Sequence, residues 1–142
     1  MNIKELKEFI EGVDIYILDQ ILKERYQQEA IILDAGCGKG RNLRWFYQNN
    51  YKVYGVDHSE SAIETAKEEY PKMALNFSIQ NLDSLNFQNA FFDHILCNAV
   101  LHFAQHKAHF IHMFSELIRV LKPGGSLFIR MASLEGIEAV SY

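Results

Sequence analysis

The sequence has little of what marks several protein classes. Its 142 residues include only two cysteines, Cys37 and Cys97, which excludes a disulfide-stapled scaffold and indicates a reduced, cytoplasmic protein. The two prolines and eight glycines form no linker between domains. No apolar run approaches the length of a membrane span, and residues 1–5 lack the basic start of a signal peptide. We therefore expect no membrane segment.

An excess of positive charge is also missing. The chain has 14 Lys and Arg residues against 18 Asp and Glu residues, a net charge of -4, and the basic residues are dispersed. Such a chain has no global field that attracts phosphate backbones, so we expect no nucleic-acid partner. The hydrophobic content of 49% suffices for one sizeable core. We expect a single domain over residues 1–142, with an N-terminal helical segment at 1–28 and an α/β core at 30–131.

Apolar runs and amphipathic runs alternate along this core. We expect strands at 30–35, 52–56, 74–79, 92–97 and 126–131, and helices at 41–49, 59–70 and 106–121. Before the core, the helical spacing of apolar residues breaks near Gly12, which predicts two short helices or one interrupted helix. The alternation predicts a Rossmann-like, doubly wound and mainly parallel sheet in a three-layer α/β/α arrangement.

A glycine-rich turn follows the first strand. The run Asp34-Ala35-Gly36-Cys37-Gly38-Lys39-Gly40 places three glycines at alternate positions, where the backbone can approach a ligand closely. Asp57 ends the next strand, and a carboxylate there can accept hydrogen bonds from ribose hydroxyls. Tight packing of strand against helix is the alternative role for the glycines. Together, however, the turn and the acid favour a site for a nucleoside cofactor.

The spacing of these glycines distinguishes between cofactors. The dinucleotide fingerprint is Gly-x-Gly-x-x-Gly, whereas this turn reads Gly-x-Gly-x-Gly, which disfavours an NAD-dependent oxidoreductase. Over residues 30–131 the chain resembles the class I S-adenosylmethionine-dependent methyltransferases. The resemblance includes residues 119–125, Arg-Val-Leu-Lys-Pro-Gly-Gly, a hallmark before the fifth strand with a structural role. Residues 40–42 are similar to the tellurite-resistance-type small bacterial members of that family.

The resemblance implies a set of contacts to S-adenosylmethionine. The glycine turn would wrap its methionine and ribose part, and Asp57 would hold the ribose hydroxyls. Asn81 stands where the family has an Asp that contacts the adenine amino group, and an amide oxygen can accept the same hydrogen bond. An alignment shifted by two positions would give this role to Asp83. The implied cofactor-binding residues are Asp34, Gly36, Cys37, Gly38, Gly40, Asn42, Asp57, His58, Asn81, Leu82 and Asn98.

The resemblance also implies where the acceptor binds. Residues 98–102 follow the fourth strand and should face the methyl group, because ligands of open α/β sheets bind outside the carboxyl ends of the strands. The Asn/Asp-Pro-Pro-Tyr signature of amino-methylating enzymes that act on nucleic acid or glutamine is absent there. His102 is the candidate for removing a proton from the acceptor, although packing against the pocket is the more frequent role of such a histidine. No general base is obligatory, because the reaction depends mainly on alignment.

Other groups have a simpler explanation than chemistry. The spacing of His102, His106, His109, His112 and Glu116 permits a metal site, but a solvated helix face explains it equally well, and we expect no metal. Cys37 and Cys97 are expected as small buried residues rather than nucleophiles. Phe9 and Tyr16 could form a lid over the cofactor, with packing into the core as the favoured alternative.

The end of the sequence bears on assembly. The family's sheet has seven strands, and too few residues follow Met131 for the last two, so we expect five strands here, either because the sequence is a piece of a longer protein or because the protein has five. The strand at 126–131 would then be an edge, through which two copies could form a homodimer. We expect an S-adenosylmethionine-dependent methyltransferase that acts on a small-molecule acceptor. The alternative is a non-catalytic module that binds the cofactor and acts through a partner.

Overall fold

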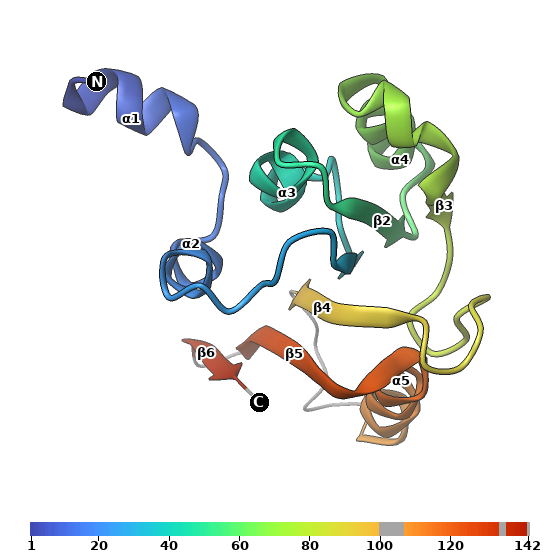
Figure 1. The fold of residues 1–142 in the computed structure, drawn as a ribbon. Helices are drawn as coiled ribbons and strands as arrows, with labels where there is room; N and C mark the ends of the chain where they lie inside the picture. Colours follow the sequence, from blue (N-terminus) through green and yellow to red (C-terminus); the bar gives the residue numbers. More distant parts are fainter. Residues whose placement is uncertain (100–106, 134–135, 142) are drawn as a thin grey trace.

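Helices and strands alternate through most of the chain (Figure 1). The computed structural model describes residues 1–99, 107–133 and 136–141. The helices are α1 (Ile3–Phe9), α2 (Ile15–Leu22), α3 (Arg44–Gln48), α4 (Glu60–Glu69) and α5 (Lys107–Val120), with 3-10 turns at Arg41–Leu43 and Pro71–Asn76. The strands are β1 (Ile31–Ala35), β2 (Lys52–Asp57), β3 (Phe77–Ile79), β4 (Phe92–Ala99), β5 (Leu121–Ser133) and β6 (Gly136–Ser141).

These strands form one sheet in the order β3-β2-β1-β4-β5-β6. The pairs β1–β2, β1–β4, β2–β3 and β4–β5 are parallel, and β6 runs antiparallel to β5. The order reverses direction at β1, so β1 and β4 flank the switch point at which open α/β sheets bind ligands. The predicted Rossmann-like, doubly wound fold is confirmed.

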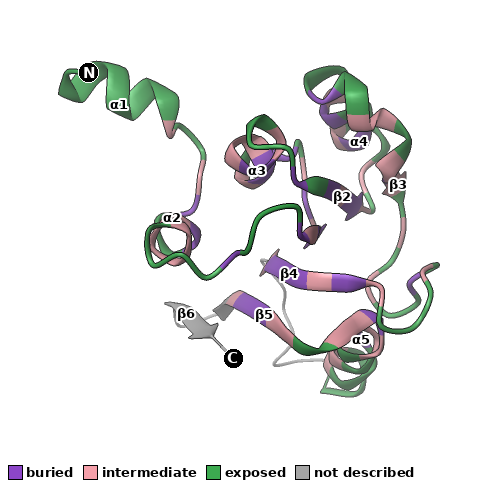
Figure 2. Cartoon of the chain, in the orientation of Figure 1, coloured by how far each residue is buried: buried purple, intermediate pink, exposed green. Residues whose placement is uncertain are grey.

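The sheet is covered on both faces. Successive strand residues point to opposite sides, so Ile32 belongs to the apolar cluster that includes residues of α2, α3 and α4, and Leu33 to the cluster that includes residues of α5. Figure 2 shows β4, near the middle of the sheet, mostly buried. The three-layer arrangement follows from this alternation, and it leaves the carboxyl ends of the strands as the place for a site.

The number of strands differs from the expected five. β6 pairs with β5 from Phe128↔Ser141 to Ser133↔Gly136, so the strand expected at 126–131 is not a sheet edge. The reason is length: β5 extends to Ser133, and a short antiparallel strand can return within the few residues that follow. One of the two strands expected to be missing is therefore present. A homodimer stays a prediction, but the free β5 edge proposed for it is occupied by β6.

Three element boundaries also differ from expectation. The strand expected from residue 126 begins at Leu121, which pairs with Phe92 of β4. The strand expected from residue 74 begins at Phe77, because Pro71 opens a 3-10 turn that continues to Asn76. The helix expected at 41–49 begins with 3-10 geometry at Arg41–Leu43 and becomes an α-helix at Arg44.

The N-terminal segment forms two helices rather than one. Asp14 caps α2, where its Oδ1 accepts a hydrogen bond from the Tyr16 N–H at 2.8 Å. α1 has no buried residue, and Figure 2 shows it exposed along its length. Phe9 and Tyr16 are 45% and 48% exposed, so the prediction that both pack into the core is wrong. α2 already covers this side of the core with Ile17, which is fully buried. No helix among the described residues is long and apolar enough to span a membrane.

Candidate functional site

The glycine turn lies at the carboxyl end of β1. Gly36, Gly38 and Gly40 have φ values of 79°, 53° and 81°, a left-handed conformation that other residues adopt only with strain. The N–H groups of Gly36 and Cys37 both donate to the Val56 carbonyl, at 2.8 and 2.9 Å. The turn is therefore hydrogen-bonded to β2. Glycine is favoured at its three alternate positions because it adopts this backbone conformation without strain.

Asp57 braces this turn from the end of β2. Its Oδ2 accepts from the Gly38 N–H at 2.9 Å, and its Oδ1 accepts from the Ser59 N–H at 2.8 Å. Each oxygen keeps capacity for a further hydrogen bond, since a carboxylate can accept about four. The neighbouring His58 side chain is 86% exposed, with Nδ1 3.6 Å from Asp57 Oδ1. The predicted ribose-binding acid is thus preorganised by the same turn that it would serve.

Asp34 is a buried acid at the start of the turn. It is 1% exposed, and neither carboxyl oxygen has a hydrogen-bond partner among the residues that the structure describes. Burial raises its pKa to about 7, and the negative charge of Asp57 contributes further. Buried polar atoms normally have partners. An acid of this kind suits a ligand that brings N–H donors or positive charge.

A cavity of about 230 Å³ opens beside the turn. Its lining residues are Gly12, Gly36, Cys37, Gly38, Lys39, Arg41, Asn42 and Asn98. A side chain at Gly38 would meet no atom within 4 Å, so this glycine faces open space. Five of the predicted cofactor-binding residues therefore come together in one cavity.

Three cavity residues were missed by sequence reasoning: Gly12, Lys39 and Arg41. Gly12 has a φ of 78°, and a Cβ there would lie 2.3 Å from Arg41 Cδ. The break in helical spacing at Gly12 was the available signal, but it did not show that this residue folds back onto the glycine turn.

Gly40 serves packing rather than the cavity lining. The Tyr70 hydroxyl donates to the Gly40 carbonyl at 2.5 Å, and a Cβ on Gly40 would lie 2.8 Å from Tyr70 Cε2. Burial raises the Tyr70 pKa to about 12, so the hydroxyl remains a donor at neutral pH. The packing alternative thus accounts for this third glycine.

The segment after β3 lies next to the Asp57 end of β2. The Gln80 N–H donates to the Asp57 carbonyl at 3.1 Å, and the Asn81 carbonyl accepts from the Ser84 N–H at 3.2 Å. Leu82 approaches the turn, since its Cδ1 lies 3.9 Å from the position of a Cβ on Gly36. Asp83 instead faces α5, with Oδ2 3.8 Å from Nδ1 of His109.

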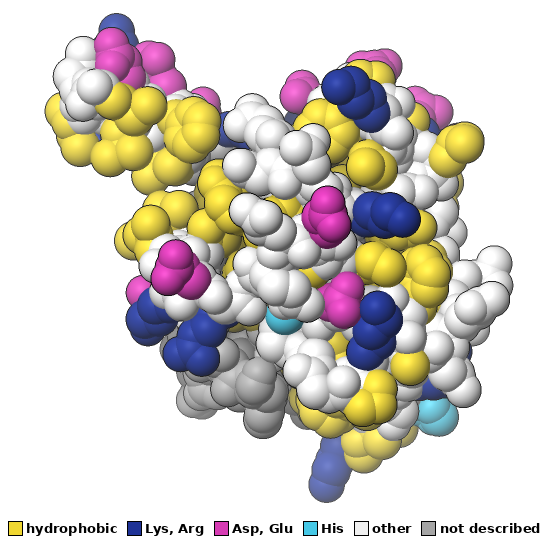
Figure 3. Space-filling model, in the orientation of Figure 1, with side chains coloured by type: hydrophobic (Ala, Val, Ile, Leu, Met, Phe, Trp, Pro, Cys, Tyr) yellow, Lys and Arg dark blue, Asp and Glu magenta, His cyan; other side chains and the backbone are white. Residues whose placement is uncertain are grey.

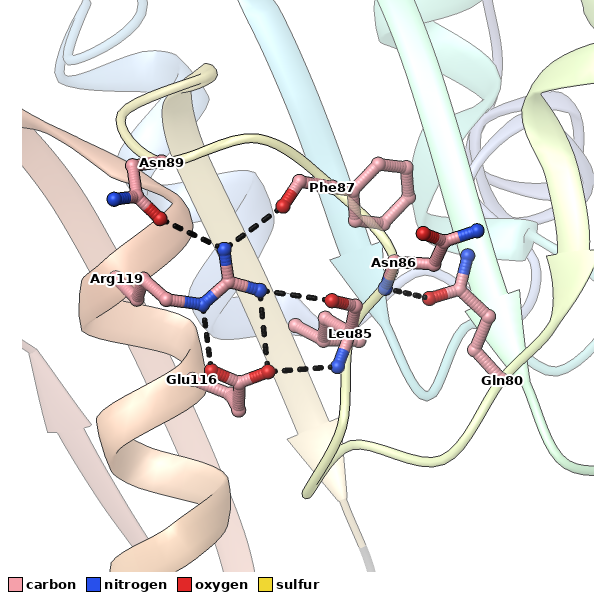
Figure 4. Close-up of polar contacts among 7 residues, drawn as sticks. All are labelled: Gln80, Leu85, Asn86, Phe87, Asn89, Glu116 and Arg119. Carbon is pink, nitrogen blue, oxygen red and sulfur yellow. Dashed lines mark hydrogen bonds and ion pairs between the residues drawn. The ribbon is translucent and has the colours of Figure 1, made fainter.

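Arg119 of α5 holds this segment in place (Figure 4). Its Nη2 donates to the Leu85 carbonyl and its Nη1 to the Phe87 carbonyl, both at 2.8 Å, while Nε pairs with Glu116 at 2.6 Å. Glu116 also accepts from the Leu85 N–H at 2.9 Å, and hydrogen bonding to Arg119 lowers its pKa. The hallmark motif that begins at Arg119 thus has the structural role implied by the resemblance, through contacts that the sequence does not reveal.

Asn42 and Asn98 meet at Asp14. The Asp14 N–H donates to Asn42 Oδ1 at 2.8 Å, and Asn98 Nδ2 donates to Asp14 Oδ2 at 3.1 Å. The N-terminal segment is therefore part of the site's construction. The catalytic candidate His102 lies outside the described residues.

The cysteines and histidines support no second chemistry among the described residues. Cys37 and Cys97 are buried free thiols, and burial raises the pKa of both, to about 12 for Cys97. This agrees with their expected packing role. Within ranges 1–99, 107–133 and 136–141, no three potential ligands are grouped to hold a metal ion. His106, like His102, lies outside these ranges.

Known proteins resemble this chain in sequence and fold. The sequence profile of the methyltransferase domain matches residues 33–129. An uncharacterized methyltransferase of Schizosaccharomyces pombe is 34% identical over 104 residues, which are 72% of this chain and 71% of that protein. A ubiquinone biosynthesis O-methyltransferase of Coxiella burnetii is 33% identical over 99 residues, 68% of this chain but 41% of its own length. A solved S-adenosylmethionine-dependent methyltransferase of Methanosarcina mazei is 30% identical, with a TM-score of 0.67 over 78% of this chain and 56% of its own.

Proposed function

The chain belongs to the methyltransferase domain family, and from that premise we propose that it transfers a methyl group from S-adenosylmethionine to a small-molecule acceptor. The observation that supports the proposal is the presence of two acids, Asp34 and Asp57, beside the glycine turn. Asp57 is held by the turn with acceptor capacity to spare, and Asp34 lies buried with unpartnered oxygens. The first suits ribose hydroxyls and the second suits the positive charge of the cofactor.

Each part of the cofactor has residues that fit it. The backbone from Gly36 to Gly38, which lines the cavity, would contact the methionine and ribose part. Asp57 would accept hydrogen bonds from both ribose hydroxyls. For the adenine we propose Asn81 and the Leu82 N–H, because Asp83, the alternative, faces His109 on α5. His58 would border the ribose from its exposed position beside Asp57.

The protein's contribution to the reaction is alignment. S-adenosylmethionine supplies an electrophilic methyl group on a sulfonium sulfur, which becomes a thioether when the methyl group is transferred and is therefore a good leaving group. The chain must hold an acceptor lone pair in line with that methyl group and exclude water. Asn98 lines the cavity at the end of β4, which supports binding of the acceptor on this side. His102 follows four residues later and remains our candidate for accepting a proton.

A small molecule is the acceptor class that we propose to test first. The Coxiella burnetii relative is named for O-methylation in ubiquinone biosynthesis, which makes phenolic oxygens a natural starting point. The net charge of -4 gives no support to a nucleic-acid acceptor. The chain spans less than half of that relative, so the physiological acceptor and the cytoplasmic location remain proposals.

A non-catalytic cofactor-binding module is the second candidate. It is favoured by the apolar surface of α1, where Ile3, Leu6 and Phe9 are 68%, 42% and 45% exposed. Figure 3 shows hydrophobic side chains gathered on this helix, and a partner could bind there.

Transfer of a radiolabelled methyl group separates the two candidates. The chain is incubated with methyl-labelled S-adenosylmethionine and a panel of phenols, amines, thiols and carboxylates, and label in the extracted products is counted. We expect label in at least one acceptor. Cofactor binding without transfer to any acceptor would favour the binding module.

A further inference from the structure

A single carboxylate joins the N-terminal segment to the cavity. Asp14 is 7% exposed, although it lies at the start of a short helix near the N-terminus. Its Oδ1 caps α2, while its Oδ2 accepts from Asn98 Nδ2 and from Arg130 Nη1. Its N–H donates to Asn42 Oδ1. Every polar group of Asp14 named here has a partner, and three of the four partners lie far away in the sequence.

The partners of Asp14 come from the elements that surround the site. Asn42 follows the glycine turn, Asn98 is near the end of β4, and Arg130 is its register neighbour on β5. Both asparagines line the 230 Å³ cavity, and so does Gly12, two residues before Asp14. Arg130 also lies over the Tyr16 ring, with Cζ 5.1 Å from the ring centre.

Fold stability alone is a weak reason for this arrangement. Burying two charges costs desolvation energy, and an apolar pair of similar size often stabilises a fold as well or better. Arg130 Nε is moreover buried without a partner among the described residues. What the ion pair does provide is a fixed position for the two asparagines, because Asp14 contacts both of them directly.

We propose that Asp14 is a positioning residue for the cofactor. It sets the amides of Asn42 and Asn98 around the cavity, and Arg130 holds its carboxylate there, two residues after Gly12 in the cavity wall. This inference rests on the proposed function, since it assigns the cavity to S-adenosylmethionine. Asp14 acts through the asparagines and has no role in the transfer itself.

The test compares S-adenosylmethionine affinity with thermal stability in four chains. They are the wild type, Asp14→Asn, the double variant Asp14→Asn with Arg130→Gln, and Asp19→Asn. The last is the matched control, because Asp19 also lies on α2 but its ion pair with Lys23, at 2.9 Å, is exposed. Isothermal calorimetry gives the affinity, and circular dichroism gives the melting temperature.

We expect Asp14→Asn to lower both quantities, with affinity reduced about tenfold or more, within the usual range of coupling between sites. The double variant removes the unpaired buried charge, so it should regain melting temperature but not affinity, since Asn98 still lacks its carboxylate partner. Asp19→Asn should change neither. If Asp14→Asn does not fold, the double variant decides.

Recovery of affinity together with stability in the double variant would overturn the positioning role, because the loss would then be one of folding. Unchanged affinity in a folded Asp14→Asn chain would overturn it as well. A wild-type chain that does not bind S-adenosylmethionine would contradict the proposed function first, and this inference with it.

Discussion

At the scale of single residues, we expect Asp34 to link cofactor binding to pH. Its pKa of about 7 in the folded chain lies well above the ordinary value of 3.8, because it is buried beside Asp57. A neighbouring positive charge from the cofactor would lower that pKa and release a proton. We therefore expect affinity for S-adenosylmethionine to rise between pH 5.5 and about 7 and then level off. Calorimetry across this pH range measures the affinity, and the use of two buffers of different ionisation enthalpy measures the released proton.

The same acid predicts a cost in stability. A carboxyl whose folded pKa is raised stabilises the fold below its unfolded pKa, and this contribution is lost as pH rises through the folded value of about 7. Asp34→Asn should therefore remove the loss, raise the unfolding free energy at pH 8 by on the order of 2 kcal/mol, and weaken cofactor binding. Urea denaturation of the wild type and of Asp34→Asn at pH 5 and pH 8 tests the stability prediction, and calorimetry tests the loss of affinity. A variant that is both less stable and unaltered in affinity would contradict this account of Asp34.

Asp57 gives a second prediction at this scale. Asp57→Ala should weaken cofactor affinity by about 1.5 to 3 kcal/mol, the usual loss for hydrogen bonds to a charged group. It also removes the acceptor of the Gly38 N–H, so the turn loses a brace. Asp57→Asn retains one acceptor oxygen, so its cofactor affinity should lie between that of the wild type and that of Asp57→Ala. Unchanged calorimetric affinity in Asp57→Ala would show that the ribose lies elsewhere.

Sequence reasoning at this scale works for residues whose role is local. The position of Asp57 beside the glycine turn could be predicted, because an acid that ends the strand after such a turn is visible in the sequence itself. The burial of Asp34 and the role of Asp14 could not, because they depend on distant residues. Asn98 and Arg130 are separated from Asp14 by 84 and 116 positions.

At the scale of elements, two glycines of one turn should behave differently when replaced by alanine. Gly40→Ala places a Cβ 2.8 Å from the Tyr70 ring at a φ of 81°, so it should cost about 1 to 3 kcal/mol of stability. Gly38→Ala meets no atom within 4 Å, so it should cost about 1 kcal/mol of backbone strain and mainly reduce cofactor affinity. Denaturation and calorimetry on both variants give the comparison. Equal loss of affinity at the two positions would contradict the division between packing and binding.

The Arg119 contacts make a prediction about the segment after β3. Arg119→Lys keeps the charge but cannot reproduce the fork that reaches both Leu85 and Phe87, so residues 80–89 should lose protection from hydrogen exchange. The global stability loss should stay near 1 kcal/mol, because the pair is partly exposed. Lys122→Arg is the matched control, since the ion pair of Lys122 is with Asp93 on β4 and not with the segment at 80–89. Unchanged exchange in residues 80–89 would remove Arg119 from this role.

The elements also show where the sequence pattern is informative. The glycine turn and the five parallel strands are predicted well, because their apolar runs are short and bounded by glycine, proline or polar residues. β6 was missed because the few residues after β5 were judged too short for an antiparallel return. The helix α1 was predicted, but its exposure was not, because helical spacing predicts an amphipathic helix but not whether anything covers its apolar side.

At the scale of the whole molecule, the site depends on the topology of the sheet. Strand order β3-β2-β1-β4-β5-β6 brings the glycine turn, Asp57 and Asn98 to the same end of the sheet, where Asp14, the N-cap of α2, accepts a hydrogen bond from Asn98. The fold and the methyltransferase family follow from motifs near these strand ends. The acceptor does not, because acceptor pockets are shaped by side chains from several elements whose contacts the sequence does not specify.

The central claim is that this site binds S-adenosylmethionine. Calorimetric titration of the wild-type chain with S-adenosylmethionine, its demethylated product and NAD tests this claim most directly. We expect S-adenosylmethionine and its demethylated product to bind saturably, with one site per chain, and NAD not to bind. Binding of NAD without binding of either sulfur compound would contradict it.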